Sequence, residues 1–239
     1  MKPEIIVHMH IAIDGKINGP HLKTDISDRS QREYYNLFLS DDRYYDKHRG
    51  WLCGTETSAV ITKHQAPVLD ESITEVPDGD FLADTDAKFF YFTLDPDGKL
   101  GWSKNYYTYF ETSPHIVEII TEKTSPAFKA YLRDLNISYI IAGKEKVDLA
   151  LAIEKISNLF DMDQLMVNGG GGINRSFLTE NLVDEVSLVV TPIADGDRDS
   201  QSLFYFNPKY NEPQSIAFNL EQADKLQDGS LWLRYSIVD

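Results

Sequence analysis

Four consecutive glycines, Gly169–Gly172, are the feature of the sequence with the clearest chemical use. They follow the apolar run 164–167, which is typical of a buried strand, and a helical pattern at 175–180 comes after them. Glycine has no Cβ, so its backbone can adopt a positive φ and approach a ligand closely. The free N–H groups and the dipole at a helix start favour a phosphate. The run therefore predicts a site for a phosphate-bearing ligand.

The alternative is a sharp turn from strand to helix that binds nothing. Two glycines would be enough for such a turn, and four lower the stability of the unliganded chain through backbone entropy, so we favour the ligand site. The run is not the dinucleotide pattern G-x-G-x-x-G, because the third glycine would fall on Arg175. It is not a P-loop either, because no Gly-Lys-Ser/Thr follows it.

The rest of the chain alternates apolar runs with helical patterns. The apolar runs are bounded by Gly, Pro, Asp or Asn, as strands usually are. We predict strands at 5–13, 50–53, 88–94, 115–120, 137–142, 164–167, 186–193 and 231–238. We predict helices at 29–39, 125–135, 148–159 and 175–180.

The order of these elements predicts the fold class. From residue 88 to 193 strands and helices alternate, which favours an α/β fold with a mostly parallel central sheet covered by helices. The last apolar runs have no helix between them, so antiparallel strands are expected at the C-terminal edge. Residues 63–86 are polar and predict a strand-free excursion. We expect a single domain over residues 1–239.

Composition excludes several classes of function. The formal net charge of −15 disfavours nucleic acid and anionic membranes as partners, although backbone N–H groups can still bind a small anion. Cys53 is the only cysteine, so no intramolecular disulfide forms and a reducing compartment is expected. No stretch approaches the length of an apolar membrane span. We therefore expect a cytoplasmic protein with a small-molecule substrate and no metal site.

Three motifs, in order along the chain, resemble the reductase family of riboflavin biosynthesis, the RibD C-terminal domain. The first is the strand that ends in Asp14-Gly15-Lys16, and the second is 51–57, with a glycine and a threonine three residues apart. The third is the glycine run followed by a helix, Leu-Val-Asp-Glu at 182–185 and an apolar strand. The resemblance extends from about residue 4 to residue 196.

This resemblance implies a dihydrofolate-reductase-like fold, NADPH as the hydride donor and a homodimer. It places Asp14 at the reacting edge of the nicotinamide as a catalytic candidate, whereas the residues alone allow a plain β-turn at Asp14-Gly15. For Thr57 the alternative to cofactor contact is the N-cap of the next helix. The cofactor-binding residues that the resemblance implies are Gly54, Thr57, Gly169, Gly170, Gly171, Gly172, Ile173 and Asn174.

Three positions depart from the family pattern on the substrate side. The family's usual Glu before the glycine run is Asn168 here, which keeps a hydrogen-bonding tip but loses the charge. A Lys of its first strand is His8 here. Histidine could still act as a proton donor, although we prefer a core or dimer-face histidine. No Ser-x-Trp substrate motif is recognisable, and Ser27 is the nearest serine.

The leading hypothesis is an NADPH-dependent reductase of a C=N or C=O group in a small heterocyclic substrate. It would be similar to 5-amino-6-(5-phosphoribosylamino)uracil reductase, with His8 and Asp14 as catalytic candidates and Asn168 and Ser27 near the substrate. The alternatives are a reductase of a pteridine or another carbonyl compound, and an inactive nucleotide-binding relative. Asp95 raises a question, because a carboxylate near the cofactor ribose would repel a 2′-phosphate.

Overall fold

The computed structural model describes residues 2–205 and 214–238. The chain divides into two compact units, and each is built from separate stretches of sequence. The first unit consists mainly of residues 49–165, and the second of residues 4–48 and the chain from residue 166 onward. The expectation of a single domain stays a prediction.

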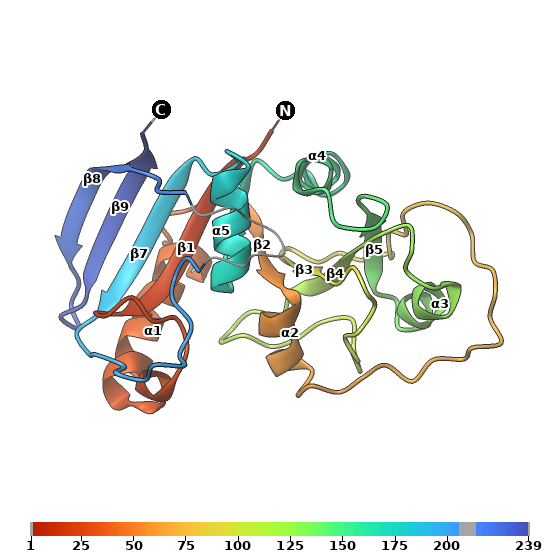
Figure 1. Cartoon of the computed structure of the whole chain (residues 1–239), viewed down its shortest axis with the longest axis horizontal. Coiled ribbons are helices and arrows are strands. Elements are labelled where there is room, and N and C mark those ends of the chain that lie inside the picture. The colour runs from red at the N-terminus through yellow and green to blue at the C-terminus, as the bar shows by residue number, and fades with distance from the viewer. Residues whose placement is uncertain (1, 206–213, 239) are drawn as a thin grey trace. The chain divides into compact units, whose positions relative to one another are not determined.

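The first unit contains a parallel sheet in the order β5-β4-β3-β2 (Figure 1). Its strands are almost completely buried, as expected for parallel strands that are covered on both faces. Its strands are β2 (His48–Gly54), β3 (Phe90–Leu94), β4 (His115–Ile120) and β5 (Ser138–Ile141). Its helices are α2 (Thr55–Ile61), α3 (Pro126–Asp134) and α4 (Leu149–Phe160).

Local sequence explains the helices of this unit. The hydroxyl of Ser125 caps α3 by accepting from the Phe128 N–H, and Pro126 occupies the first helical position. Asp148 caps α4 in the same way. At the end of α4, Leu159 is 39% exposed, whereas Phe160 is buried. The excursion at 63–86 contains no regular strand, as predicted.

In the second unit the strands of the sheet lie in the order β6-β1-β7-β9-β8. Strands β1 and β7 are parallel, whereas β9 pairs antiparallel with both β7 and β8, which confirms the antiparallel C-terminal edge. The strands of the second unit are β1 (Glu4–Ala12), β6 (Gln164–Val167), β7 (Glu185–Thr191), β8 (Phe218–Lys225) and β9 (Leu231–Ile237). The first two residues of β6 still belong to the first unit. The helices of the second unit are η1 (Pro20–Lys23), α1 (Asp25–Leu39) and α5 (Gly171–Thr179).

Three elements were not predicted from the sequence. Strand β8 has mostly exposed residues, so it lacks the apolar run that marks a buried strand. Helices η1 and α2 are only four and seven residues long, too short for a clear helical period. Over the described ranges, no helix is both long enough and apolar enough to cross a membrane.

Candidate functional site

The glycine run connects β6 to α5 in the second unit. Gly169 has a φ of 95°, and Gly170 is the N-cap of α5. The carbonyl oxygen of Gly170 accepts from the N–H groups of Ile173 and Asn174, at 2.9 and 3.1 Å. The N–H groups of Gly171 and Gly172 have no partner among the described residues. Helix α5 thus begins inside the glycine run, four residues before the predicted start, and offers two amide donors.

The structure gives these glycines a second role, in packing. A Cβ at Gly171 would lie 2.1 Å from the carbonyl oxygen of Ser202, and one at Gly172 would lie 2.9 Å from the hydroxyl of Tyr205. The buried side chain of Asn174 donates to the carbonyl of Leu203 at 3.1 Å. The segment 202–205 therefore lies directly against the start of α5. Its backbone requires glycine at position 171 even without a ligand, whereas at position 172 only the tip of the Tyr205 side chain would have to shift.

The residues at the start of α5 still fit a diphosphate. Two amide N–H groups are available, and the first turn of the helix contains no acidic residue, although the protein carries a net charge of −15. The helix start can therefore hold an anion. The buried Oδ1 of Asn174 has no hydrogen-bond partner among the described residues, but an amide oxygen is an acceptor and contributes nothing to anion binding.

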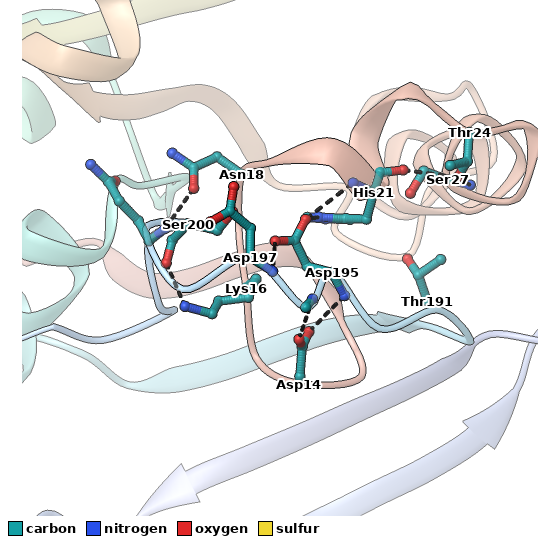
Figure 2. A network of polar contacts seen from close by, with 12 residues as sticks. Asp14, Lys16, Asn18, His21, Thr24, Ser27, Thr191, Asp195, Asp197 and Ser200 are labelled. Atoms are coloured by element: carbon teal, nitrogen blue, oxygen red, sulfur yellow. Dashed lines mark hydrogen bonds and ion pairs between the residues drawn. The ribbon is translucent and has the colours of Figure 1, made fainter.

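The turn after β1 is tied to the chain that follows β7 (Figure 2). The carboxylate of Asp14 accepts from the backbone N–H groups of Asp195 and Gly196, at 3.2 and 3.0 Å. These two bonds lower the pKa of Asp14, which is exposed. The catalytic role that the resemblance implies for Asp14 stays a prediction, and the structure adds a clamping role.

A second tie joins His21 to Asp195, and sequence reasoning missed it. The Nδ1 atom of His21 lies 2.7 Å from Asp195 Oδ2, and neither side chain is exposed to solvent. Asp195 also accepts from the Ser200 hydroxyl and from the His21 backbone N–H. These hydrogen bonds lower the pKa of Asp195, so it is ionised at neutral pH. The only sequence signal was a histidine in the Gly-Pro-His turn after the first strand.

His8 lies in the core of the second unit. Its ring is fully buried and stacks on Tyr34, with ring centroids 4.3 Å apart. Nε2 donates to the Tyr34 carbonyl at 3.3 Å, which leaves Nδ1 to accept from Ser187 at 2.9 Å. Burial lowers the pKa of His8 to about 3. Both ring nitrogens are engaged and the ring is neutral, which favours the interpretation as a core histidine over that of a proton donor.

The two substrate candidates lie in different surroundings. Asn168 is half-buried at the end of β6, and its Nδ2 donates to the hydroxyl of Tyr34. Ser27 is fully buried in α1, and its hydroxyl has no hydrogen-bond partner among the described residues. Nearby in the same unit, His10 Nε2 lies 2.8 Å from the Ser30 hydroxyl and 2.7 Å from that of Thr191. The carboxyl ends of β1 and β7 thus hold a buried polar cluster.

The remaining cofactor candidates belong to the first unit. Gly54 is the N-cap of α2, and Thr57 is the third helical residue, so the alternative reading of Thr57 as an N-cap is wrong. The hydroxyl of Thr57 has no hydrogen-bond partner among the described residues, whereas that of Thr55 donates to the Leu94 carbonyl. Whether Gly54 and Thr57 contact a cofactor stays a prediction.

Asp95 does not have the exposed position that would repel a phosphate. It is fully buried, and its Oδ2 accepts from the backbone N–H groups of Lys99 and Leu100, at 2.7 and 2.9 Å. Burial raises the pKa of Asp95 to about 6. Its carboxyl group holds the turn after β3.

Comparison with known proteins connects this geometry to a family. The family model of the RibD C-terminal domain matches residues 102–230, more than half of the chain. The 2,5-diamino-6-ribosylamino-4(3H)-pyrimidinone 5′-phosphate reductase of Methanothermobacter thermautotrophicus is 36% identical over 84 residues. That match spans 35% of this chain and only 38% of the archaeal reductase.

Solved structures confirm the fold class. A pyrimidine reductase-like protein from Corynebacterium diphtheriae has a TM-score of 0.61 at 16% identity, over 99% of this chain and 92% of its own. RibD from Acinetobacter baumannii has a TM-score of 0.65 at 15% identity, over 99% of this chain and 58% of its own. At these identities the likeness shows the fold alone, which is the predicted α/β reductase fold.

Proposed function

Because the chain belongs to the RibD C-terminal domain family, we propose that it is an NADPH-dependent reductase of a ribosylamino-pyrimidine phosphate in riboflavin biosynthesis. The observation that carries the proposal is the pair of available amide N–H groups at the start of α5, in a chain that matches this family. The name of the archaeal relative supports 2,5-diamino-6-ribosylamino-4(3H)-pyrimidinone 5′-phosphate as the substrate.

In this proposal the protein binds and orients, and the cofactor supplies the reducing chemistry. When NADPH is bound, hydride comes from C4 of its nicotinamide ring. The N–H groups of Gly171 and Gly172 bind the diphosphate, and the helix dipole adds to their positive potential. Asn168, half-buried at the end of β6, presents its amide to the substrate, while its bond to Tyr34 fixes the side chain.

Two further expectations, on cofactor contacts in the first unit and on the oligomeric state, stay predictions. Gly54 and Thr57 stay candidates for cofactor contact, and a cytoplasmic homodimer remains the expected form. The exposed β8, with Leu220 57% exposed, is a surface on which a second copy could pack. Analytical ultracentrifugation of the purified protein would test the dimer.

The activity is tested by following NADPH absorbance in the presence of the pyrimidinone phosphate. Oxidation of NADPH that depends on this substrate supports the proposal. Tight NADPH binding without oxidation, also with the 5-amino-6-(5-phosphoribosylamino)uracil counterpart, would contradict it and favour the inactive nucleotide-binding alternative.

The diphosphate assignment is tested at Gly172, because a side chain at Gly171 would collide with the Ser202 backbone. A Cβ at Gly172 meets only the tip of the Tyr205 side chain. Gly172→Asp places a negative charge beside the amide donors, and Gly172→Ala is the matched control with the same Cβ. Since an acidic residue stabilises a helix N-terminus, the fold should be retained.

We expect Gly172→Asp to bind NADPH at least about tenfold more weakly than Gly172→Ala, which corresponds to about 1.4 kcal/mol. Calorimetry gives both dissociation constants, and thermal unfolding checks the fold. Equal affinities in the two variants would overturn the diphosphate assignment.

A further inference from the structure

In the chain that follows β7, several hydrogen-bond donors converge on the carboxylate of Asp195. Asp195 Oδ2 accepts from both the ring and the backbone N–H of His21, and its Oδ1 accepts from the Asp197 N–H at 3.1 Å. The Ser200 hydroxyl is a further donor. A Cβ at Gly19 would lie 2.1 Å from Ser200 Oγ and 2.5 Å from Asp195 Oδ2. The backbone of Gly19 therefore covers this carboxylate closely.

Beyond Asp195 the chain runs along the turn that follows β1 (Figure 2). The Lys16 ammonium donates to the Ser200 carbonyl at 2.5 Å, and the Gln201 N–H donates to the Asn18 side chain at 2.6 Å. The Leu203 N–H donates to the Gly15 carbonyl at 3.0 Å. Residues 195–203, called here the wall segment, are thus held along most of their length.

The wall segment ends at the start of α5. The Ser202 carbonyl lies so close to Gly171 that no Cβ fits between them, and the Leu203 carbonyl accepts from Asn174. The wall segment therefore forms one side of the place where the two glycine amides are available. At its other end the wall segment is attached to η1 by the buried pair of His21 and Asp195.

We propose that His21 and Asp195 are positioning residues, which hold the wall segment in place beside the start of α5 and thereby support cofactor binding. The inference rests on the proposed function, since it assigns the start of α5 to the NADPH diphosphate. Asp195 anchors the wall segment through its charge, and His21 holds that charge in a solvent-free position. The role requires only a donor at Nδ1 of His21 and no proton transfer.

This requirement separates two variants of His21. His21→Phe keeps the volume of the ring and removes its donor, so Asp195 loses a buried partner. His21→Asn places an amide N–H close to where Nδ1 lies and keeps the bond. A hydrogen bond to a charged group contributes about 1.5–3 kcal/mol, so its loss corresponds to about ten- to hundredfold.

We expect His21→Phe to weaken NADPH binding by about tenfold or more, and His21→Asn by less than about threefold. Arg198, an exposed residue of the wall segment, supplies a readout that needs no cofactor. Trypsin should cleave after Arg198 faster in His21→Phe than in the wild type or His21→Asn, and mass spectrometry identifies the fragments. Circular dichroism and thermal unfolding confirm that each variant folds.

The outcomes distinguish this inference from the proposed function. A wild type that binds neither NADPH nor NADH overturns the proposed function, and cleavage at Arg198 still reports on the wall segment. If the wild type binds NADPH and His21→Phe binds it equally well, the positioning role is overturned. A loss of kcat in both variants at unchanged affinity would also overturn it, because it would make His21 a catalytic acid.

Discussion

Asp14 in the second unit and Asp95 in the first unit fix a loop in the same way, yet their carboxyl groups differ in pKa. Each carboxylate accepts from two consecutive backbone N–H groups. Asp14 is exposed and its pKa is lowered, whereas Asp95 is buried and its pKa is raised to about 6. Two hydrogen bonds therefore do not offset the effect of burial on the pKa of Asp95.

Glu118, a neighbour of Asp95, shows the same effect of burial. Glu118 is fully buried, and its pKa is raised well above the ordinary range by burial and by the charge of Asp95. Oδ1 of Asp95 and Oε2 of Glu118 each lack a hydrogen-bond partner among the described residues. At Asp95 burial raises the pKa by more than the two N–H donors lower it. Ionising Glu118 as well would place a second negative charge in the same buried region, which is energetically unfavourable.

Buried histidines in the second unit show the opposite dependence on pH. Burial lowers the pKa of His8 to about 3 and that of His10 to about 4. Below about pH 6.5 the unfolded chain binds protons that the folded rings do not bind, so stability falls as the pH falls. For Asp95 the folded state binds the extra proton between about pH 4 and 6, so stability falls as the pH rises.

The largest expected effect is that of Asp95→Asn at alkaline pH. Asparagine keeps an oxygen for the Lys99 and Leu100 N–H groups and cannot ionise. A raised pKa of about two units corresponds to about 3 kcal/mol, so the variant should gain up to that amount at pH 8 and little at pH 4. Urea unfolding at both pH values measures it.

Asp97→Asn is the matched control for this prediction. Asp97 is exposed two residues further on, and hydrogen bonds to Lys99 and Lys123 lower its pKa. It should gain far less stability at pH 8 than Asp95→Asn, because the charge of Asp97 is only a minor cause of the raised pKa of Asp95. A gain of equal size in both variants would mean that general charge repulsion, rather than the burial of Asp95, sets the effect.

His8→Phe should change stability on the acid side. Phenylalanine keeps the stacking on Tyr34 but loses the bonds to Ser187 and the backbone, so it is less stable at pH 7. Between pH 7 and pH 5 the variant should lose about 2 kcal/mol less stability than the wild type. In the wild type the His8 ring stays neutral in the folded state while the unfolded chain takes up a proton, which lowers the free energy of unfolding by about that amount at pH 5. Urea unfolding at the two pH values gives this difference.

An exposed histidine provides the comparison for His8. His64→Asn should lose as much stability between pH 7 and pH 5 as the wild type, because His64 is exposed. Asparagine tolerates the positive φ of 56° at this position. If His8→Phe loses as much stability on acidification as the wild type, His8 does not stay neutral in the folded protein.

The smallest expected effect is that of Asp14→Asn. The side chain is exposed, and asparagine retains one oxygen for the N–H groups of Asp195 and Gly196. We expect NADPH affinity to change by less than about threefold, as is usual for exposed polar contacts. A loss as large as that of His21→Phe would mean that Asp14, and not Asp195, holds the wall segment.

The sequence predicts those helices and strands that a local pattern of residues determines. The strand at 164–167 was predicted to the residue, because a buried apolar run bounded by glycine leaves little choice. Strand β8 was missed, because its residues are mostly exposed and form no apolar run. The start of α5 was misplaced, because glycine has a poor helix propensity and its run therefore gives no helical signal in the sequence.

The polar contacts of the site were the least predictable part. His21 and Asp195 lie 174 residues apart, and only the parallel pairing of β1 with β7 brings their loops together. No spacing rule applies to such a pair. His8, by contrast, was a candidate from its position, and only its complete burial distinguishes a core histidine from an acid.

The most direct test of the account is a calorimetric titration of the wild-type protein with NADPH and with NADH. We predict that NADPH binds with a dissociation constant in the micromolar range, about −8 kcal/mol, and more tightly than NADH. If neither dinucleotide binds, the start of α5 holds another ligand or none, and the assignment of this chain as a nicotinamide-dependent reductase is contradicted.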